Sequence, residues 1–125
     1  MIDRPSDESF PYSLGTCSSV GDPHYTTFDG SSYDFMGVCR YVLAKDCKTK
    51  YFTVVTENTE CGIPGSSCSK FLDIYFNDNA NSSIRLGHNK KVLIDGVAVS
   101  LPYTAPGLTI QKVGNIVTLR CVCLL

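Results

Sequence analysis

The chain has 125 residues, of which 43% are hydrophobic, so it is long enough for one domain with a packed core. Eleven Lys and Arg residues nearly balance twelve Asp and Glu residues, and a formal net charge of −1 offers no basic stripe for nucleic acid. No apolar run approaches the roughly 20 residues that a membrane span needs.

Residues 1–16 are largely polar and contain proline, and we expect them to form a flexible lead-in to a domain over residues 17–125. The first residues, MIDRPSDESFPYS, lack the basic head and apolar run of a secretory signal. Any export signal is therefore expected outside this segment.

The middle of the chain alternates between apolar and polar residues, with the period of two that is typical of strands. Residues 51–56 are rich in β-branched and aromatic side chains. In residues 70–76, Leu72 and Ile74 point to one face of the expected strand and Asp73 points to the other. The pattern predicts half-buried strands rather than helices.

Two hairpins are predicted in the second half of the chain. Asp95 and Gly96 separate two apolar runs, and Asp-Gly between such runs is the strongest short signal for a tight hairpin turn. A second turn is expected at Gly114 and Asn115. With no convincing amphipathic helix, the predicted fold class is all-β, an antiparallel meander, sandwich or curled sheet. The side chains expected to fill its interior are Phe28, Phe35, Tyr41, Phe52, Phe71 and Phe76.

The cysteine content favours an oxidising compartment. The chain lacks C-x-x-C pairs, and its histidines lie far from any cysteine pair, so the usual zinc spacings are missing. Disulfides are the better interpretation, and an odd number leaves at least one thiol without a partner in the chain. A glycosylation sequon at Asn81 agrees with secretion. The seven cysteines are Cys17, Cys39, Cys47, Cys61, Cys68, Cys121 and Cys123.

Residues 17–30 (CSSVGDPHYTTFDG) and 33–47 (YDFMGVCRYVLAKDC) carry a specific pattern. Together they resemble the opening of a von Willebrand factor type D (VWD) domain. The resemblance runs from about residue 17 to about residue 120 and includes residues 57–68 and 92–96. It implies a module of a secreted multimeric glycoprotein, such as a gel-forming mucin or von Willebrand factor, and a β fold truncated on its C-terminal side.

The resemblance also implies a pattern of disulfides. Cys61 and Cys68 are expected to bridge each other, and the loop-entropy relation gives roughly 2.5 kcal/mol for so short a closure. In the family, the counterparts of Cys17, Cys39 and Cys47 pair with cysteines of a second half that these 125 residues do not contain. Cys121 and Cys123 do not match the family pattern and are alternative partners. The remaining alternative is free thiols or bridges to other chains.

Family members bind calcium through an aspartate that corresponds to Asp29. Calcium takes six to eight oxygen ligands with several carboxylates, so Asp29 is expected to form only part of a site. Calcium is therefore expected in a full-length domain and doubtful in these residues alone. The alternative is a simple turn with Gly30. The polar run over residues 77–81 is interpreted as a turn between strands.

Asp22, Pro23 and His24 form an Asp-Pro bond followed by an imidazole. By resemblance to gel-forming mucins, this bond is a candidate for self-cleavage in a mildly acidic lumen. The Asp22 carboxyl group would attack its own main-chain carbonyl, and the imidazole titrates in that pH range. The alternative interpretation is an ordinary turn, because Asp-Pro commonly starts turns.

Three functions follow from these observations. The first is a structural and interaction module whose partners are other chains of an extracellular glycoprotein, with neither nucleic acid nor a membrane span. The second is a module that cleaves itself at Asp22–Pro23. The third, an enzyme using Cys121 and Cys123 or a histidine, lacks the accompanying motifs of such sites, so no turnover chemistry is predicted. His88 lies in a polar loop and is expected to be solvated.

Overall fold

The computed structural model describes residues 2–5, 14–21, 23–48, 51–77 and 79–121, with backbone alone at 2–5, 14–16 and 79–81. Strands dominate this part of the chain, which confirms the predicted all-β fold. None of its helices is long and apolar enough to cross a membrane. The elements are β1 Ile2–Pro5, β2 Leu14–Val20, β3 His24–Thr26, β4 Ser32–Asp34, β5 Arg40–Lys45, β6 Phe52–Glu60, β7 Ser67–Phe76, β8 Asn79–Leu86, the 3₁₀ helix η1 His88–Lys90, β9 Val92–Ile94, β10 Val97–Val99, β11 Tyr103–Ala105, β12 Leu108–Val113 and β13 Ile116–Cys121.

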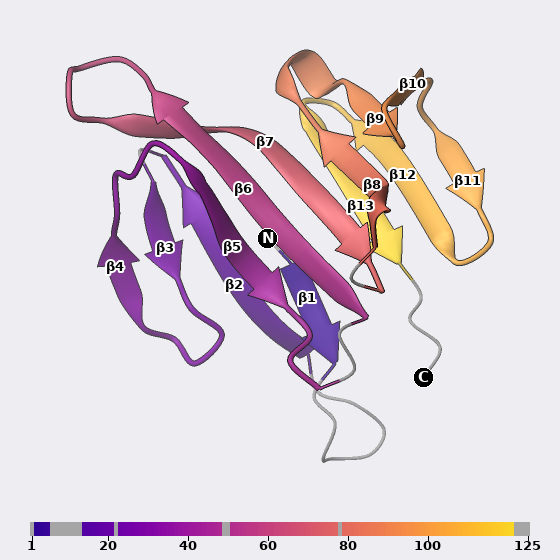
Figure 1. Cartoon of the computed structure of the whole chain (residues 1–125), viewed down its shortest axis with the longest axis horizontal. Helices are drawn as coiled ribbons and strands as arrows, with labels where there is room; N and C mark the ends of the chain where they lie inside the picture. Colours follow the sequence, from indigo (N-terminus) through magenta and orange to yellow (C-terminus); the bar gives the residue numbers. More distant parts are fainter. Residues whose placement is uncertain (1, 6–13, 22, 49–50, 78, 122–125) are drawn as a thin grey trace.

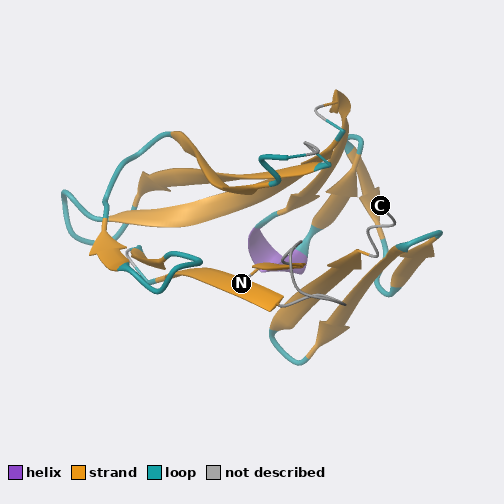
Figure 2. Cartoon of the chain, turned by 90° about the horizontal axis from the view of Figure 1, so that it is seen from below, coloured by secondary structure: helices purple, strands orange, loops and turns teal. Residues whose placement is uncertain are grey.

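Backbone pairing joins the described strands into three antiparallel sheets (Figure 1). The first follows the order β1-β2-β3-β4, the second β10-β9-β8-β7-β6-β5 and the third β11-β12-β13. Neighbours within each sheet are consecutive along the chain, so each sheet is a meander, as the turn signals predicted. Figure 2 shows the sheets as separate layers around a common interior.

The core is built from side chains of all three sheets. Cys17 of β2, Val54 of β6 and Ile110 of β12 are buried in one cluster, together with Ile74 and Ile84 of the largest sheet. Because each sheet is apolar on only one face, none can bury that face alone. The layers therefore depend on one another for stability.

The alternation predicted for residues 70–76 is confirmed by the register of the largest sheet. Val54, Ile74 and Ile84 are cross-strand partners, so they share the face that meets the core. Asp73 and Arg85, one residue away, are also partners and share the opposite face. A period of two along each strand produces this division.

Both predicted hairpins are present. Ile94 pairs with Val97 around Asp95 and Gly96, which take φ angles of 50° and 83°. Positive φ at both central residues is the requirement of the type I′ turn, and Gly96 meets it without steric cost. The Gly114–Asn115 turn likewise joins β12 to β13.

Within the expected lead-in over residues 1–16, the structure describes residues 2–5 and 14–16, and both lie in strands, whereas the flexibility of this lead-in stays a prediction. Residues Ile2–Pro5 form β1, which pairs with β2 from Ile2 opposite Cys17 to Pro5 opposite Leu14. Without β1, the outer edge of β2 would present unpaired N–H and C=O groups. Pro5 ends an edge strand, where a missing N–H group is tolerated. The division of the chain at residue 17 stays a prediction.

The aromatic residues expected in the interior take different environments. Phe28, Phe52 and Phe76 pack against the core. Phe35 does not, because it is 44% exposed in the segment between β4 and β5, and the prediction for it is wrong. It lies outside regular strand, where the period of two no longer decides which way a side chain points.

Asp73 is the buried charge of the largest sheet, with 2% of its surface exposed. The Arg85 guanidinium donates to both carboxylate oxygens, Nε to Oδ1 at 2.7 Å and Nη2 to Oδ2 at 2.8 Å. Arg40 Nη1 donates to Oδ2 at 2.9 Å and to Glu57 Oε2 at 3.1 Å, while its Nη2 donates to the Tyr75 hydroxyl at 2.9 Å. We call these five residues the charge cluster. The cluster connects β5, β6, β7 and β8 across the outer face of the sheet.

Burial and ion pairing act in opposite directions on the Asp73 carboxyl group. Burial raises its pKa, but the hydrogen bonds from Arg85 and Arg40 outweigh burial and hold the pKa of Asp73 below its ordinary value. The Arg85 guanidinium also lies over the Phe71 ring, with its Cζ 4.5 Å from the ring centroid. The carboxylate is thus charged and fully paired in the folded chain.

Replacing Asp73 with Asn should lower the free energy of unfolding at neutral pH by about 1–3 kcal/mol, because two arginines lose their carboxylate. The folded-state pKa lies below the unfolded value, so this contribution is complete above about pH 4 and is lost as pH falls through the folded-state pKa. Urea unfolding between about pH 2 and pH 7 measures both effects.

The matched control is Glu60→Gln, which removes an exposed carboxylate from the end of β6. Its unfolding curve should follow that of the unsubstituted chain. An Asp73→Asn variant with the same acid dependence as the unsubstituted chain would contradict the assignment.

Candidate functional site

The Gly-Asp-Pro-His motif closes the hairpin between β2 and β3. Val20 and His24 are cross-strand partners, so residues 21–23, which we call the motif turn, connect them. Gly21 has a φ angle of 73°, and Pro23 is fully buried. Asp22, the predicted nucleophile, lies outside the described residues. The described part of the motif therefore consists of a glycine in left-handed backbone, a buried proline ring and the imidazole that follows it.

His24 forms an ion-pair contact that its sequence context did not suggest. It is the cross-strand partner of Asp34 on β4, and its Nδ1 lies 2.6 Å from Asp34 Oδ1. A carboxylate only accepts hydrogen bonds, so Nδ1 carries the proton in this contact. The opposite edge of the ring faces Gly21, since a Cβ atom there would lie 3.3 Å from Cδ2 and 3.9 Å from Nε2. The imidazole thus lies between Asp34 and Gly21.

Tyr25, the next residue of β3, points to the opposite face and connects the motif to the largest sheet. Its hydroxyl accepts a hydrogen bond from Asn58 Nδ2 at 3.0 Å. Asn58 Oδ1 in turn accepts from the hydroxyls of Thr56 at 3.0 Å and Ser69 at 3.2 Å. Tyr25, Thr56 and Asn58 are all buried. This interlayer network fixes β3 relative to β6 and β7.

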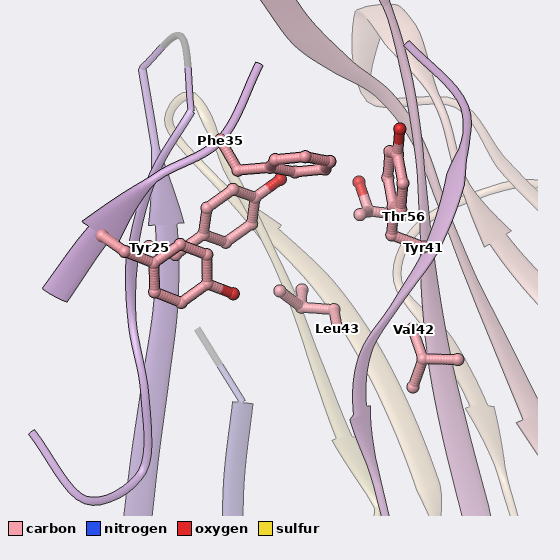
Figure 3. Close-up of a pocket in the computed structure, with 7 residues that line it drawn as sticks. Tyr25, Phe35, Tyr41, Val42, Leu43 and Thr56 are labelled. Atoms are coloured by element: carbon pink, nitrogen blue, oxygen red, sulfur yellow. The ribbon is translucent and has the colours of Figure 1, made fainter. Parts of the chain in front are cut away.

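A hollow of about 270 Å³ adjoins the network (Figure 3). Tyr25 stacks on Tyr33 with ring centroids 5.1 Å apart, and Phe35 meets Tyr41 edge to face at 4.9 Å. The other described residues that line it are Val42, Leu43 and Thr56. None of these lining side chains is a carboxylate, imidazole or thiol. The hollow therefore offers apolar contact rather than acid–base chemistry.

Asp29 lies in the loop that joins β3 to β4 and is exposed. The Thr27 hydroxyl donates to its carboxylate, and hydrogen bonds from Thr27 and the Ser31 backbone lower the pKa of Asp29. Within the described residues, no group of three or more His, Cys, Asp or Glu side chains is placed to hold a metal ion. One carboxylate falls short of the several that calcium requires, so this loop alone does not fit a calcium site. Calcium binding by a longer form of the domain stays a prediction.

The predicted bridge between Cys61 and Cys68 is confirmed as a disulfide, with Cα atoms 5.9 Å apart. It closes the connection between β6 and β7. In the described part of the chain, Cys39 and Cys47 are exposed thiols and Cys121 is a half-buried one.

Cys17, by contrast, is buried in the core, and Cys123 lies outside the described residues. The pairing of these two therefore stays a prediction. The same holds for glycosylation of Asn81, whose backbone belongs to β8 and whose side chain is not described. His88 is exposed in η1, as expected, and its ring meets the Phe71 ring edge to face at 6.4 Å.

Sequence reasoning missed Asp34, Asn58 and the charge cluster. Asp34 could have been found by pairing β3 and β4 about the turn at Asp29 and Gly30, since His24 then lies opposite it. Asn58 carries no such signal, because its contact with Tyr25 spans 33 positions and two sheets. Only the packing of the layers brings those two together.

Comparison with known proteins agrees with the resemblance described above. The sequence model of the von Willebrand factor type D domain matches residues 17–122. SCO-spondin of Gallus gallus is 39% identical over 103 residues, which is 81% of this chain and 2% of that protein. Zonadhesin of Oryctolagus cuniculus is 35% identical over 117 residues, 90% of this chain and 5% of that protein. Mucin-5AC of Homo sapiens is 41% identical over 98 residues, 73% of this chain and 2% of that protein. The chain thus spans a few per cent of the length of these relatives.

The interlayer network should contribute measurably to stability. Replacing Tyr25 with Phe leaves the buried Asn58 amide without its acceptor, so the free energy of unfolding should fall by about 1–2 kcal/mol. The control is Tyr33→Phe, in the stacked ring that is 52% exposed, for which we expect a change within about 0.5 kcal/mol. Urea unfolding followed by circular dichroism gives both values. Equal losses in the two variants would show that the Tyr25 hydroxyl does not bridge the sheets.

Proposed function

The chain belongs to the von Willebrand factor type D domain family, and from that membership we propose that it is a structural and interaction module of an extracellular multimeric glycoprotein. The parent glycoprotein would resemble a mucin or von Willebrand factor. In it, the module organises other chains through disulfide-linked assembly and carries no turnover chemistry. The family match, which covers residues 17–122, is the observation that carries it.

The state of the cysteines supports this proposal. The Cys61–Cys68 disulfide belongs to an oxidising compartment, where such bridges persist. Cys39 and Cys47 are exposed, so their sulfur atoms are accessible to thiols or disulfides of another chain. The sequon at Asn81 is a further site that such a compartment would modify. Partners are therefore proposed to be other chains of the same extracellular glycoprotein.

Disulfide-linked assembly can be tested on the chain secreted from eukaryotic cells. We expect oligomers on a non-reducing gel that collapse to monomer in the Cys39→Ser, Cys47→Ser double variant, because the exposed thiols form the bridges. Peptide mapping without reductant should show Cys61 linked to Cys68 in both forms. The matched control is Ser18→Ala and Ser31→Ala, which changes two small polar residues and leaves every cysteine in place.

A monomeric unsubstituted chain in which Cys39 and Cys47 are fully alkylated would refute assembly through these residues. Peptide maps in which Cys61 and Cys68 are both free thiols would go further and contradict the extracellular assignment.

A second candidate function is self-cleavage at the Asp22–Pro23 bond, triggered by mild acid. The position of the His24 ring beside Gly21 favours it, because an imidazole next to the motif is a group that can donate a proton. The burial of Pro23 also supports it, since a fixed ring restrains the leaving group during attack.

The proposed reaction is intramolecular. A carboxylate oxygen of Asp22 attacks its own main-chain carbonyl carbon, and the C–N bond to Pro23 breaks. The bond electrons remain on the proline nitrogen, which takes a proton and becomes a secondary amine. The products are a cyclic anhydride at Asp22 and a new amino terminus at Pro23. Water then opens the anhydride to two carboxyl groups, or a hydroxyl or amine of another molecule opens it to an ester or amide.

Incubation of the purified chain at about pH 5 to 6 should release fragments 1–22 and 23–125, which intact mass spectrometry under reduction detects. The fragments should not form in the Asp22→Ala variant, which has no carboxyl group to attack. Fragments that form equally in both proteins would indicate proteolysis, and no fragments in the unsubstituted chain would refute self-cleavage.

A further inference from the structure

We propose that the outer face of the largest sheet binds a sulfated glycan, at a group of cationic side chains around Phe71. These side chains come from β5, β7, β8 and η1, so only the folded sheet brings them together. The inference rests on the extracellular assignment proposed above and adds a ligand that this assignment does not name. We call the following residues the basic patch: Arg40, Lys70, Phe71, Arg85 and His88.

A β-bulge in β7 directs Lys70 to the outer face. On β6, Glu57 pairs with Phe71. The next residue, Asn58, pairs with Ser69, which leaves Lys70 as an additional residue between the two partners. Ser69 points inward, since its hydroxyl donates to Asn58 Oδ1 in the interlayer network. Strict alternation would direct Lys70 and Phe71 to opposite faces, whereas the bulge allows both to share the outer face, where Lys70 is exposed.

The Phe71 ring is the centre around which the other members of the patch gather. The Lys70 ammonium lies 5.1 Å from the ring centroid, and Arg85 Cζ lies 4.5 Å from it. The exposed His88 ring meets Phe71 edge to face, with 6.4 Å between the centroids. Cation–π attraction restrains a charged group at an aromatic surface without using all of its N–H donors. Two cations and an imidazole are therefore held at one ring.

The buried Asp73 carboxylate fixes the two arginines of the patch from below. A guanidinium group has five N–H donors, and Arg85 uses two of them on Asp73. Arg40 donates to Asp73, Glu57 and the Tyr75 hydroxyl. Each guanidinium thus keeps N–H donors for an acceptor outside the chain. Because both side chains are already ordered, a ligand that meets these donors loses little of the binding energy to side-chain entropy.

The charge that this face presents to water is mainly positive. The Asp73 side chain is 3% exposed, against 42% for Arg40 and 34% for Arg85. Glu57, the second carboxylate of the charge cluster, is 30% exposed and is paired with Arg40. With Lys70, three permanent cations face these two carboxylates, one of which is buried. The local excess of positive charge attracts an anion, although the net charge of the whole chain is −1.

A sulfate ester matches the donors of the basic patch. Its three terminal oxygens accept several hydrogen bonds at once, and it stays ionised at any physiological pH. Guanidinium groups bind such oxyanions through parallel N–H bonds, and an ammonium adds a compact charge. In the extracellular setting proposed above, sulfated glycans carry these groups at short, regular intervals. A patch with three cations around one ring fits a short segment of such a glycan.

The test measures the binding of the full chain to a fluorescent heparin oligosaccharide by anisotropy, at about 0.15 M salt. We expect Lys70→Gln to weaken binding about two- to fivefold, because it removes one exposed ionic contact. Arg85→Lys should also weaken binding, since it keeps the charge and loses the planar fork. Circular dichroism checks the fold of both variants. Lys70 lies outside the ion pairs of Asp73, so its variant tests the patch even if Arg85→Lys is unstable.

The matched control is Lys112→Gln, which removes the same charge from an exposed position on β12, outside the patch. Its affinity for the heparin oligosaccharide should equal that of the unsubstituted chain. A desulfated oligosaccharide of the same length should bind about tenfold more weakly or less, because several ionic contacts are lost together. Polyglutamate with the same number of charges tests whether an acidic polypeptide is the ligand instead.

The outcomes separate this inference from the proposal on which it rests. Equal losses in Lys70→Gln and Lys112→Gln, or no binding by the unsubstituted chain, would refute the site. Equal affinity for the desulfated oligosaccharide or for polyglutamate would refute the sulfated glycan as its ligand. Neither result changes the peptide map or the non-reducing gel that test the extracellular module. A map with Cys61 and Cys68 as free thiols would refute that module, while the contrast between the two lysine variants would still decide the site.

Discussion

The hydrogen bond between Tyr25 and Asn58 is the constraint on which the arrangement of the motif depends. It links the sheet that carries the motif to the largest sheet, in a region where Thr56 and Ser69 complete the polar contacts of the amide. An unpaired buried amide costs more than a satisfied one gains, so the two sheets are favoured in one relative position. Because side chains alternate along β3, a Tyr25 that points inward obliges His24 to point outward.

The buried Asp73 carboxylate of the charge cluster is stabilised differently from the buried Asn58 amide. Asp73 is covered by the guanidinium groups of Arg85 and Arg40 rather than by a second sheet. Those arginines keep part of their surface in water, which reduces the desolvation cost of the ion pairs. The outer face of the largest sheet therefore stays hydrated while its strands are cross-linked, and the opposite face is free to form the core. The outer face of this sheet is thus stabilised by ion pairs, and its inner face by apolar packing in the core.

Local patterns were sufficient to predict the strand over residues 70–76 and the two hairpins in the second half of the chain. The period of two over residues 70–76 and the Asp95–Gly96 turn both act over a few residues, and the structure contains both. The Cys61–Cys68 bridge was predicted from family resemblance rather than from physical reasoning. Asp73 was correctly given an outward direction, but its burial could not be predicted, because it depends on Arg40, 33 positions away.

The candidate site was predicted less completely than the fold, for the same physical reason. Pro23 and His24 were identified because they are adjacent in the sequence motif. Asp34 lies ten positions away and is brought beside His24 only by the register between β3 and β4. Register is set by the turn over residues 27–31, where Thr27 and Ser31 exchange backbone and side-chain hydrogen bonds. A shift of one residue would bring Tyr33 or Phe35 opposite His24 instead.

The exposure of the His24–Asp34 pair limits how much this ion pair can contribute to the stability of the fold. The two side chains keep 57% and 63% of their surface in water, and exposed cross-strand pairs contribute only about 0.2–1 kcal/mol to stability. The fold therefore does not require this contact, in contrast to the buried pairs of Asp73 and Asn58. We therefore expect a substitution at Asp34 to leave the buried contacts between the layers in place. The Gly-Asp-Pro-His motif is thus anchored to the fold by the Tyr25 hydroxyl and the buried Pro23 ring rather than by this exposed ion pair.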